Sequence, residues 1–185
     1  MRKVLVVVDM QNDFIDGTLG TPEAKAIVPN VLKKIRLYED MALEAEHGHL
    51  IRNIYFTRDT HGDNYFNTYE GKNLPVKHCI ECTDGWQLQS NIMEAALHCG
   101  IIVDKNTFGS FRLPKLVSLV QDFDDIEIEV IGLCTDICVV TNALILRSKF
   151  PNVPITVDSS CCAGTTPERH KAALETMQSC QIKVI

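Results

Sequence analysis

A cysteine at the start of a predicted helix is the residue best placed for nucleophilic chemistry. An apolar run over residues 126–131 ends at Gly132, and helical spacing of apolar residues resumes at Val139 after a short polar turn. Cys138 therefore falls where the helix begins. The positive field at a helix N-terminus favours thiolate, and the unpaired amides of the first turn can hold a developing oxyanion. The alternative is that Cys138 is one more buried cysteine in a chain that has eight.

Two charged residues at other predicted strand ends supply what a cysteine nucleophile requires. Asp9 follows the first apolar run and Lys105 follows the third. Because ligands bind beyond the carboxyl ends of parallel strands, we expect both residues to lie near Cys138. Asp9 can take the thiol proton and return it to a leaving amine, while Lys105 can lower the pKa of the thiol and orient Asp9. Alternatively, Asp9 caps a turn and Lys105 is a surface residue.

These three residues can lie close together only if a sheet places them at the same edge. Continuous apolar runs alternate with amphipathic segments, which is typical of a parallel sheet with helices on both faces. We therefore expect an α/β fold, and one domain over residues 1–185. The predicted strands are residues 3–8, 53–57, 101–104, 126–131, 155–157 and 182–185, and the predicted helices are residues 27–46, 87–98, 113–121, 139–149 and 167–179.

Composition and charge argue against several classes of protein. The 185 residues are 45% hydrophobic and 23% charged, which is typical of a globular chain with a sizeable core. A formal net charge of -6 argues against a nucleic-acid partner, which requires a concentrated basic face. The apolar run over residues 4–8 is too short to span a bilayer and lacks a cleavage site for a signal peptidase. We therefore expect a cytoplasmic protein with no membrane partner.

The cysteines are expected to be thiols. Without an export signal, a disulfide framework is not expected. Cys79 and Cys82 resemble half of a zinc site, and Cys161 and Cys162 are adjacent, but neither pair has a partner motif at zinc-finger spacing. No Cys-x-x-Cys opens a helix after a strand, which argues against a thioredoxin-type redox protein.

Three segments resemble the signatures of the isochorismatase-like cysteine hydrolases. They occur in the family's order and at its separations, as residues 8–14 (VDMQNDF), 104–111 (DKNTFGSF) and 132–139 (GLCTDICV). The resemblance implies a three-layer Rossmann-like fold, with a six-stranded, mainly parallel sheet between two layers of helices. Because family members are often dimers or larger, it also implies a homo-oligomer.

The resemblance assigns roles to residues within these segments. Asp9, Lys105 and Cys138 match the catalytic triad of the family. A cis peptide bond is implied between Leu133 and Cys134, which aims the amides of Cys134 and Cys138 at the substrate oxygen as an oxyanion hole. Substrate contacts are expected from Phe14, Leu133 and Phe108.

A long polar segment, residues 60–85, carries side chains of the metal-ligand type. Such a segment in a compact domain is usually functional or disordered. The ligand-type residues in it, or directly before it, are Asp59, His61, Glu70 and His78. They suit zinc, or manganese or iron, and Asp63 is an alternative to Glu70. Their order resembles the metal site of nicotinamidases, where the ion holds the pyridine nitrogen of nicotinamide. Alternatively, Asp59 caps a turn, and His61 and His78 are loop residues that face solvent.

The expected reaction is hydrolysis of a small carboxamide. The resemblance favours nicotinamide, which would give nicotinate and ammonia for NAD salvage. Nicotinamidases commonly have an aromatic residue and then proline shortly before the last metal histidine, whereas residues 74–78 are LPVKH, with one residue added and no aromatic. An aromatic wall orients a flat ring. Phe14 remains for that purpose, and loop aromatics that could replace the missing ring are Tyr65, Phe66, Tyr69, Trp86 and Phe108.

Two alternative functions stay open on the sequence. A metal-independent member of the family would act on another small amide, such as a ureido or carbamoyl compound or biuret. A non-catalytic binding protein on the same fold would be expected to lose the triad, whereas Asp9, Lys105 and Cys138 are all present.

Overall fold

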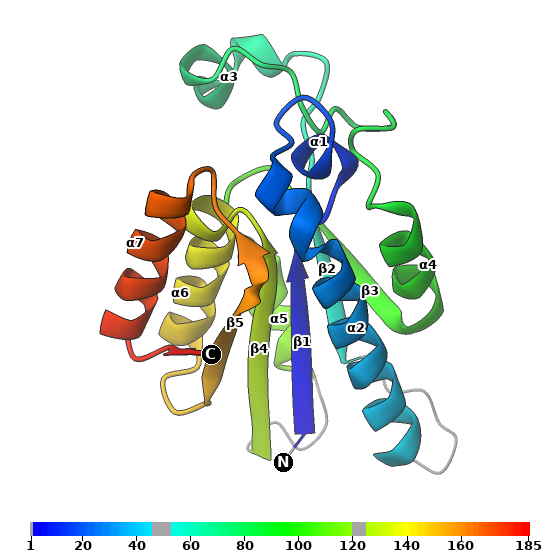
Figure 1. The fold of residues 1–185 in the computed structure, drawn as a ribbon, viewed down its shortest axis with the longest axis vertical. Helices are drawn as coiled ribbons and strands as arrows, with labels where there is room; N and C mark the ends of the chain where they lie inside the picture. The colour runs from blue at the N-terminus through cyan, green and yellow to red at the C-terminus, as the bar shows by residue number, and fades with distance from the viewer. Residues whose placement is uncertain (1, 46–52, 120–124) are drawn as a thin grey trace.

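A six-stranded parallel sheet forms the centre of the molecule. The computed structural model describes residues 2–45, 53–119 and 125–185, and its strand order is β3-β2-β1-β4-β5-β6 (Figure 1). All neighbouring strands pair in parallel. The strands are β1 (Arg2–Val8), β2 (Ile54–Asp59), β3 (Gly100–Lys105), β4 (Ile126–Leu133), β5 (Ile155–Ala163) and β6 (Lys183–Val184).

Helices cover both faces of the sheet, which confirms the predicted three-layer α/β fold (Figure 1). One face carries α2 (Pro22–Ala45) and α4 (Ser90–Cys99), and the other carries α5 (Arg112–Val117), α6 (Val140–Lys149) and α7 (Pro167–Ser179). Alternate side chains of β2 serve the two layers. The Tyr55 hydroxyl donates to the Leu116 carbonyl in the α5 layer, whereas the Phe56 ring lies against Gly100 where α4 ends. None of the described helices has the length and apolar character needed to cross a membrane.

Several element bounds differ from the predictions because of local capping and one irregular strand. Helix α2 begins at Pro22, five residues before the predicted start, because the Thr21 hydroxyl accepts from the Ala24 amide and proline suits the first helical turn. Strand β5 continues past the predicted end to Ala163, with a register shift against β4 between Val130 and Gly132. Helix α5 ends at Val117. The predicted helix ends at residues 46 and 121 lie outside the described residues.

The long polar segment is folded back onto the carboxyl end of the sheet. It contains a 3-10 turn, η1 (Tyr65–Asn67), and a short helix, α3 (Tyr69–Asn73). A parallel bridge between His61 and Ile80 closes the loop. The segment is therefore ordered, and its functional role stays a prediction. The prediction of one domain over residues 1–185 also stays a prediction.

Gly132, the residue before the last one of β4, has a backbone conformation that favours glycine. Its φ is +116°, and it pairs with Val8 of β1. A Cβ built on Gly132 would lie 2.1 Å from the Val8 carbonyl oxygen. The close approach of these two strands sets the position of the turn that follows.

Replacing Gly132 with alanine should therefore destabilise the protein by roughly 3 kcal/mol or more, since positive φ and a clash with backbone both oppose the new side chain. Urea denaturation compared with wild type measures this. Gly62→Ala is the matched control, because its Cβ would meet only the Asn64 side-chain oxygen, at 3.1 Å. Equal stability of the Gly132 and Gly62 variants would contradict the packing described here.

Candidate functional site

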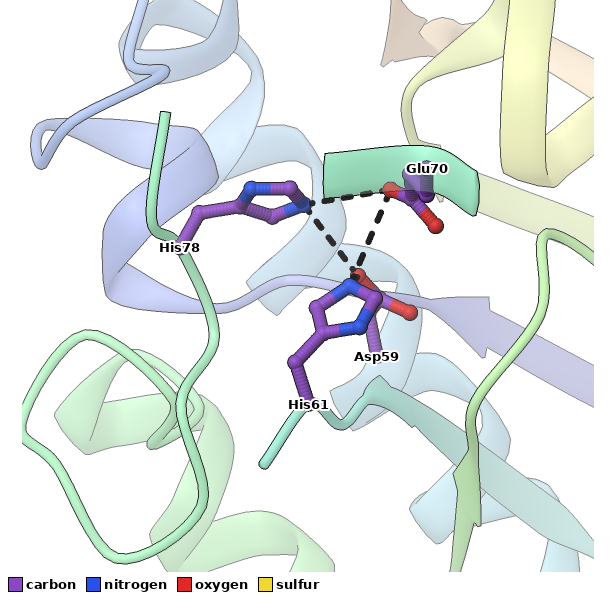
Figure 2. Close-up of side chains that lie close together, drawn as sticks. All are labelled: Asp59, His61, Glu70 and His78. Atoms are coloured by element: carbon purple, nitrogen blue, oxygen red, sulfur yellow. Dashed lines mark hydrogen bonds and ion pairs between the residues drawn. The ribbon is translucent and has the colours of Figure 1, made fainter. Parts of the chain in front are cut away.

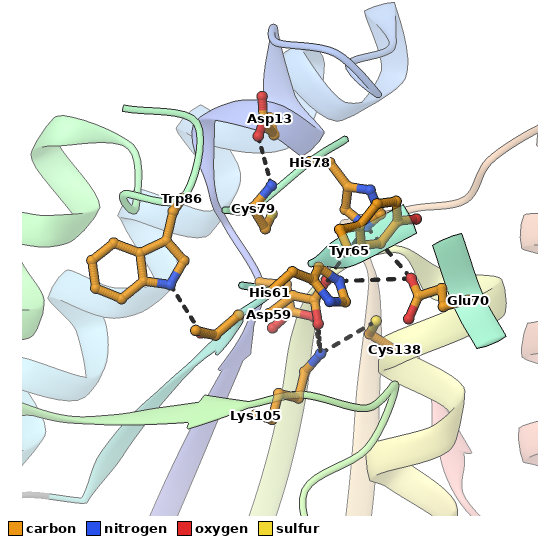
Figure 3. A network of polar contacts seen from close by, with 12 residues as sticks. Asp13, Asp59, His61, Tyr65, Glu70, His78, Cys79, Trp86, Lys105 and Cys138 are labelled. Atoms are coloured by element: carbon orange, nitrogen blue, oxygen red, sulfur yellow. Dashed lines mark hydrogen bonds and ion pairs between the residues drawn. The ribbon is translucent and has the colours of Figure 1, made fainter. Parts of the chain in front are cut away.

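Asp9, Lys105 and Cys138 come together beyond the carboxyl ends of β1, β3 and β4. The strand order reverses between β1 and β4, and ligands of open α/β sheets bind at such a point. The three residues are 0%, 6% and 5% exposed, respectively. Figure 3 shows the Lys105 ammonium group pointing at both Asp59 and the Cys138 thiol.

The Lys105 ammonium is the central charge of the site. Its Nζ lies 2.7 Å from Asp9 Oδ2, 3.5 Å from Asp59 Oδ1 and 3.6 Å from Cys138 Sγ. Burial alone would lower the pKa of Lys105, but the negative charges of Asp9 and Asp59 and a Cys138 thiolate outweigh burial and raise it. The lysine is thus a permanent cation, not the surface residue of the alternative hypothesis.

Asp9 is held as a buried carboxylate by a residue that the sequence analysis missed. The Thr57 hydroxyl donates to Asp9 Oδ1 over 2.7 Å, and Oδ2 faces Lys105. Asp9 has a φ of +46°, a conformation that aspartate adopts more readily than most residues. Burial raises its pKa, against the lowering effect of Lys105. This carboxyl is therefore a stronger base than an exposed aspartate.

Burial and the neighbouring charges act on the pKa of the Cys138 thiol in opposite directions. Burial and the neighbouring Asp9 carboxylate raise its pKa well above 9, although Lys105 acts in the opposite direction. Lys105 thus lowers the pKa of this thiol as predicted, burial and Asp9 oppose it, and the prediction of a thiolate stays a prediction. Two carboxylates, Asp9 and Asp59, surround one lysine, so a further negative charge on sulfur is unfavourable until the proton moves to Asp9.

The turn that carries Cys138 is fixed from two sides. Thr135, the first residue of the π-helical turn η3 (Thr135–Val139), shares a 2.8 Å hydrogen bond with His170 Nδ1 of α7. Asn142 donates to the Cys138 carbonyl over 2.8 Å and to the Phe108 carbonyl over 3.2 Å, which ties Cys138 to the loop after β3. The predicted cis peptide bond between Leu133 and Cys134 is present. The oxyanion-hole role of the Cys134 and Cys138 amides stays a prediction.

The four predicted metal ligands form one cluster beside Lys105 (Figure 2). His61 Nε2 lies 2.8 Å from Asp59 Oδ2 and 3.7 Å from Glu70 Oε1. His78 Nε2 lies 3.5 Å from each of the same two oxygens. Ligand atoms around a tetrahedral zinc ion are separated by about 3.3–3.5 Å, so these donors fit a divalent cation. The fourth ligand-type residue of the cluster is Glu70. Asp63, the predicted alternative to Glu70, is exposed and is not part of the cluster.

The cluster is electrostatically suited to a cation. Burial alone would raise the pKa of Asp59, but His61, His78 and Lys105 hold it well below its usual value. Burial would lower the pKa of His78, yet Asp59 and Glu70 raise it to about 10. Two carboxylates thus attract positive charge to this point, and a bound metal ion would supply that charge in place of a proton.

Aromatic rings hold the two histidines. Tyr65 is fully buried, with its ring centroid 4.9 Å from that of His61 and 5.1 Å from that of His78, and its hydroxyl donates to the Leu74 carbonyl. The Phe14 ring packs against His78 in a tilted arrangement, with the two ring centroids 5.6 Å apart. Tyr65 therefore fixes the orientation of both histidine rings.

The other residues predicted to contact the substrate, or to replace the missing aromatic ring, do not share one environment. Trp86 stacks on Arg58, and its indole N–H donates to Thr60. Leu133 packs into the core, and Phe108 is 47% exposed on the loop after β3. Phe66 and Tyr69 are also exposed. Phe14 is the predicted substrate-contact residue that the structure places against the ligand cluster.

Gln11 is a second residue that the sequence analysis missed. Its side chain accepts from the Asp59 amide over 2.7 Å and donates to the carbonyls of Asp59 and Trp86, each over 2.8 Å. It therefore clamps the backbone of a predicted metal ligand. The sequence feature that could have pointed to Gln11 is its position two residues after Asp9, within the segment of residues 8–14.

Comparison with known proteins identifies the family. The isochorismatase domain model matches residues 3–185. The chain belongs to the isochorismatase family. Over 197 aligned residues, which cover 99% of this chain and 98% of the relative, it is 28% identical to a nicotinamidase/pyrazinamidase of Mycobacterium tuberculosis. It is 29% identical, over 97% of this chain and 89% of the relative, to a probable inactive nicotinamidase of Arabidopsis thaliana.

A solved structure shares the fold of this isochorismatase-family chain. The crystal structure of a pyrazinamidase of Pyrococcus horikoshii in complex with zinc is 26% identical, covers 100% of this chain and 99% of its own, and superposes with a TM-score of 0.76. The predicted resemblance and its implication of a nicotinamidase-like hydrolase are thereby confirmed.

Replacing Asp9 with asparagine should lower the pKa of the Cys138 thiol, because a neighbouring negative charge is removed while Lys105 stays. At neutral pH we expect wild-type Cys138 to react slowly with iodoacetamide, faster only above about pH 9, and Asp9→Asn to react several-fold faster. Peptide-level mass spectrometry measures modification of Cys138 against the exposed Cys180 in the same sample. A faster wild-type rate would show that the resting group is a thiolate.

Proposed function

We propose that this isochorismatase-family protein hydrolyses a small carboxamide through a thioester on Cys138, with nicotinamide as the substrate and nicotinate and ammonia as the products. The observation that supports this most directly is the buried Lys105 ammonium, which lies 2.7 Å from the base Asp9 and 3.6 Å from the nucleophile Cys138. The similarity to a nicotinamidase/pyrazinamidase supports the choice of substrate.

In the first half of the reaction, Asp9 removes the thiol proton and Cys138 Sγ attacks the amide carbon. The carbonyl oxygen takes the negative charge, and the amides of Cys134 and Cys138 are the proposed donors to it. Asp9 then passes its proton to the amide nitrogen, the carbon–nitrogen bond breaks and ammonia leaves. The raised pKa of Asp9 suits this role because the same carboxyl must both accept and return one proton.

In the second half, water replaces ammonia at the thioester. Asp9 removes a proton from that water, whose oxygen attacks the acyl carbon. The carbon–sulfur bond then breaks, Cys138 recovers a proton and the acid is released. Throughout both halves, Lys105 keeps its charge and holds the Asp9 carboxylate in place.

A metal ion held by the cluster would bind the aromatic ring of the proposed substrate. Asp59, His61, Glu70 and His78 would hold the ion, and zinc suits their two imidazoles and two carboxylates, with manganese or iron as alternatives. A bound divalent ion would offer a Lewis-acidic partner to the ring nitrogen of the substrate. Phe14, which packs on His78, would contact the face of that ring.

Replacing Cys138 with alanine should reduce kcat/KM for the amide by at least about 1,000-fold, because it removes the sulfur that forms the proposed acyl intermediate. Ammonia release from nicotinamide, pyrazinamide, a ureido compound and biuret measures both the reaction and the substrate. The control is Cys180→Ala, at an exposed thiol, which should leave turnover unchanged. Turnover retained by a folded Cys138→Ala protein would contradict the mechanism, and wild-type binding without ammonia release would favour a non-catalytic role.

Replacing Tyr65 with leucine should weaken metal binding by about 10-fold or more, because the groups that orient metal ligands contribute to affinity. Tyr65→Phe is the matched control, since it keeps both ring contacts and loses the hydrogen bond to Leu74. Competition with a chelator of known zinc affinity measures the dissociation constants. Equal affinities for the two variants would contradict the orienting role of the ring, and wild type without bound metal would contradict the metal site.

A further inference from the structure

A second group of metal-ligand side chains lies between α2 and α4, away from the cluster of Figure 2. Glu39 comes from α2, while His98 and Cys99 are the last two residues of α4. The Cys99 thiol donates to Glu39 Oε1 over 3.0 Å, and His98 Nδ1 lies 4.0 Å from the same oxygen. One ligand atom of each residue lies within 4.8 Å of the others.

The spacing of these atoms is close to that of a zinc coordination sphere. Zinc–sulfur bonds of about 2.3 Å and zinc–nitrogen or zinc–oxygen bonds of about 2.0–2.2 Å separate tetrahedral ligands by about 3.4–3.6 Å. The observed 3.0 and 4.0 Å fall on either side of that range. Small side-chain rotations would therefore bring the three donors onto one ion.

The environment of the sulfur also favours a cation. Cys99 Sγ lies 3.0 Å from a Glu39 oxygen and 3.1 Å from the Ala95 carbonyl oxygen, whereas one thiol proton can bridge to only one of them in full. Cys99 itself is 3% exposed, but the His98 side chain is 71% exposed. An ion can thus arrive from solvent through His98 and reach a buried sulfur.

We propose that Glu39, His98 and Cys99 form a second binding site, for zinc or a similar thiophilic divalent cation. On binding, the Cys99 thiol loses its proton to solvent and Sγ, Glu39 Oε1 and His98 Nδ1 each donate an electron pair to the ion, while water takes the fourth position. The ion would join α2 to the end of α4, beside the start of β3. This site is independent of the proposed amide hydrolysis.

Cobalt(II) distinguishes this site from the cluster of Figure 2, because only this one contains sulfur. A thiolate ligand gives cobalt(II) an intense near-ultraviolet charge-transfer band, which oxygen and nitrogen ligands do not. The titration uses full-length protein carrying Cys138→Ala, so that the thiol near the first cluster cannot contribute. We expect a thiolate–cobalt band whose full intensity corresponds to one ion bound at this site, in addition to any ion bound by the cluster of Figure 2, and which zinc displaces.

Substitutions then show which cysteine gives rise to the cobalt band. Cys99→Ser should abolish it, His98→Ala and Glu39→Gln should weaken cobalt binding at this site several-fold, and Cys180→Ser should leave the band unchanged. Zinc should also raise the melting temperature of the Cys138→Ala protein more than that of the Cys99→Ser, Cys138→Ala protein. Absence of the band, or its persistence in the Cys99→Ser protein, would overturn the proposal. Because no readout requires turnover, failure here is distinguishable from failure of the proposed function.

Discussion

One buried ammonium group neutralises the charges on which the site depends. Asp9 is fully buried and Asp59 nearly so, and burying two carboxylates without a partner would cost several kcal/mol. Lys105, within 3.5 Å of both, offsets that cost. The three residues follow or end β1, β2 and β3, so the sheet register that aligns Asp59 with Lys105 also places the cation over Asp9. The register of the strands therefore determines both where these charged groups lie and how their charges are balanced.

The Asp59 carboxylate joins the two halves of the site. Its Oδ1 faces Lys105 at 3.5 Å, while its Oδ2 faces His61 at 2.8 Å and His78 at 3.5 Å. Removing negative charge from Asp59, by protonation or by a bound cation, would leave Lys105 to act more strongly on Asp9 and Cys138. The groups proposed for chemistry and those proposed for ring recognition are thus electrostatically coupled through one side chain.

Much of the fold and site was predictable because the apolar runs of this chain mark its strands and polar residues follow them. All six strands and the convergence of Asp9, Lys105 and Cys138 follow from that pattern. The full length of β5 does not, because the polar residues Asp158, Ser159 and Ser160 interrupt its apolar run beside a shift in register. Thr57 was missed because its partner, Asp9, is 48 residues away in sequence. The protonation of Cys138 depends on summed burial and charge, which a sequence does not display.

The sheet and the long loop carry different parts of the proposed specificity. The hydrogen-bonded register of the strands holds Asp9 and Lys105, and the Asn142 side chain holds the turn that carries Cys138. The groups proposed for acyl transfer therefore have little freedom to adapt. The loop lacks the aromatic residue expected before His78, yet it holds that histidine between Tyr65 and Phe14. A buried tyrosine from the other end of the loop thus orients the ligands where the expected ring is absent. Because Tyr65 is fully buried, the ring of the proposed substrate would contact Phe14 and side chains at the rim of the site. Differences in amide preference between this chain and its relatives should arise there.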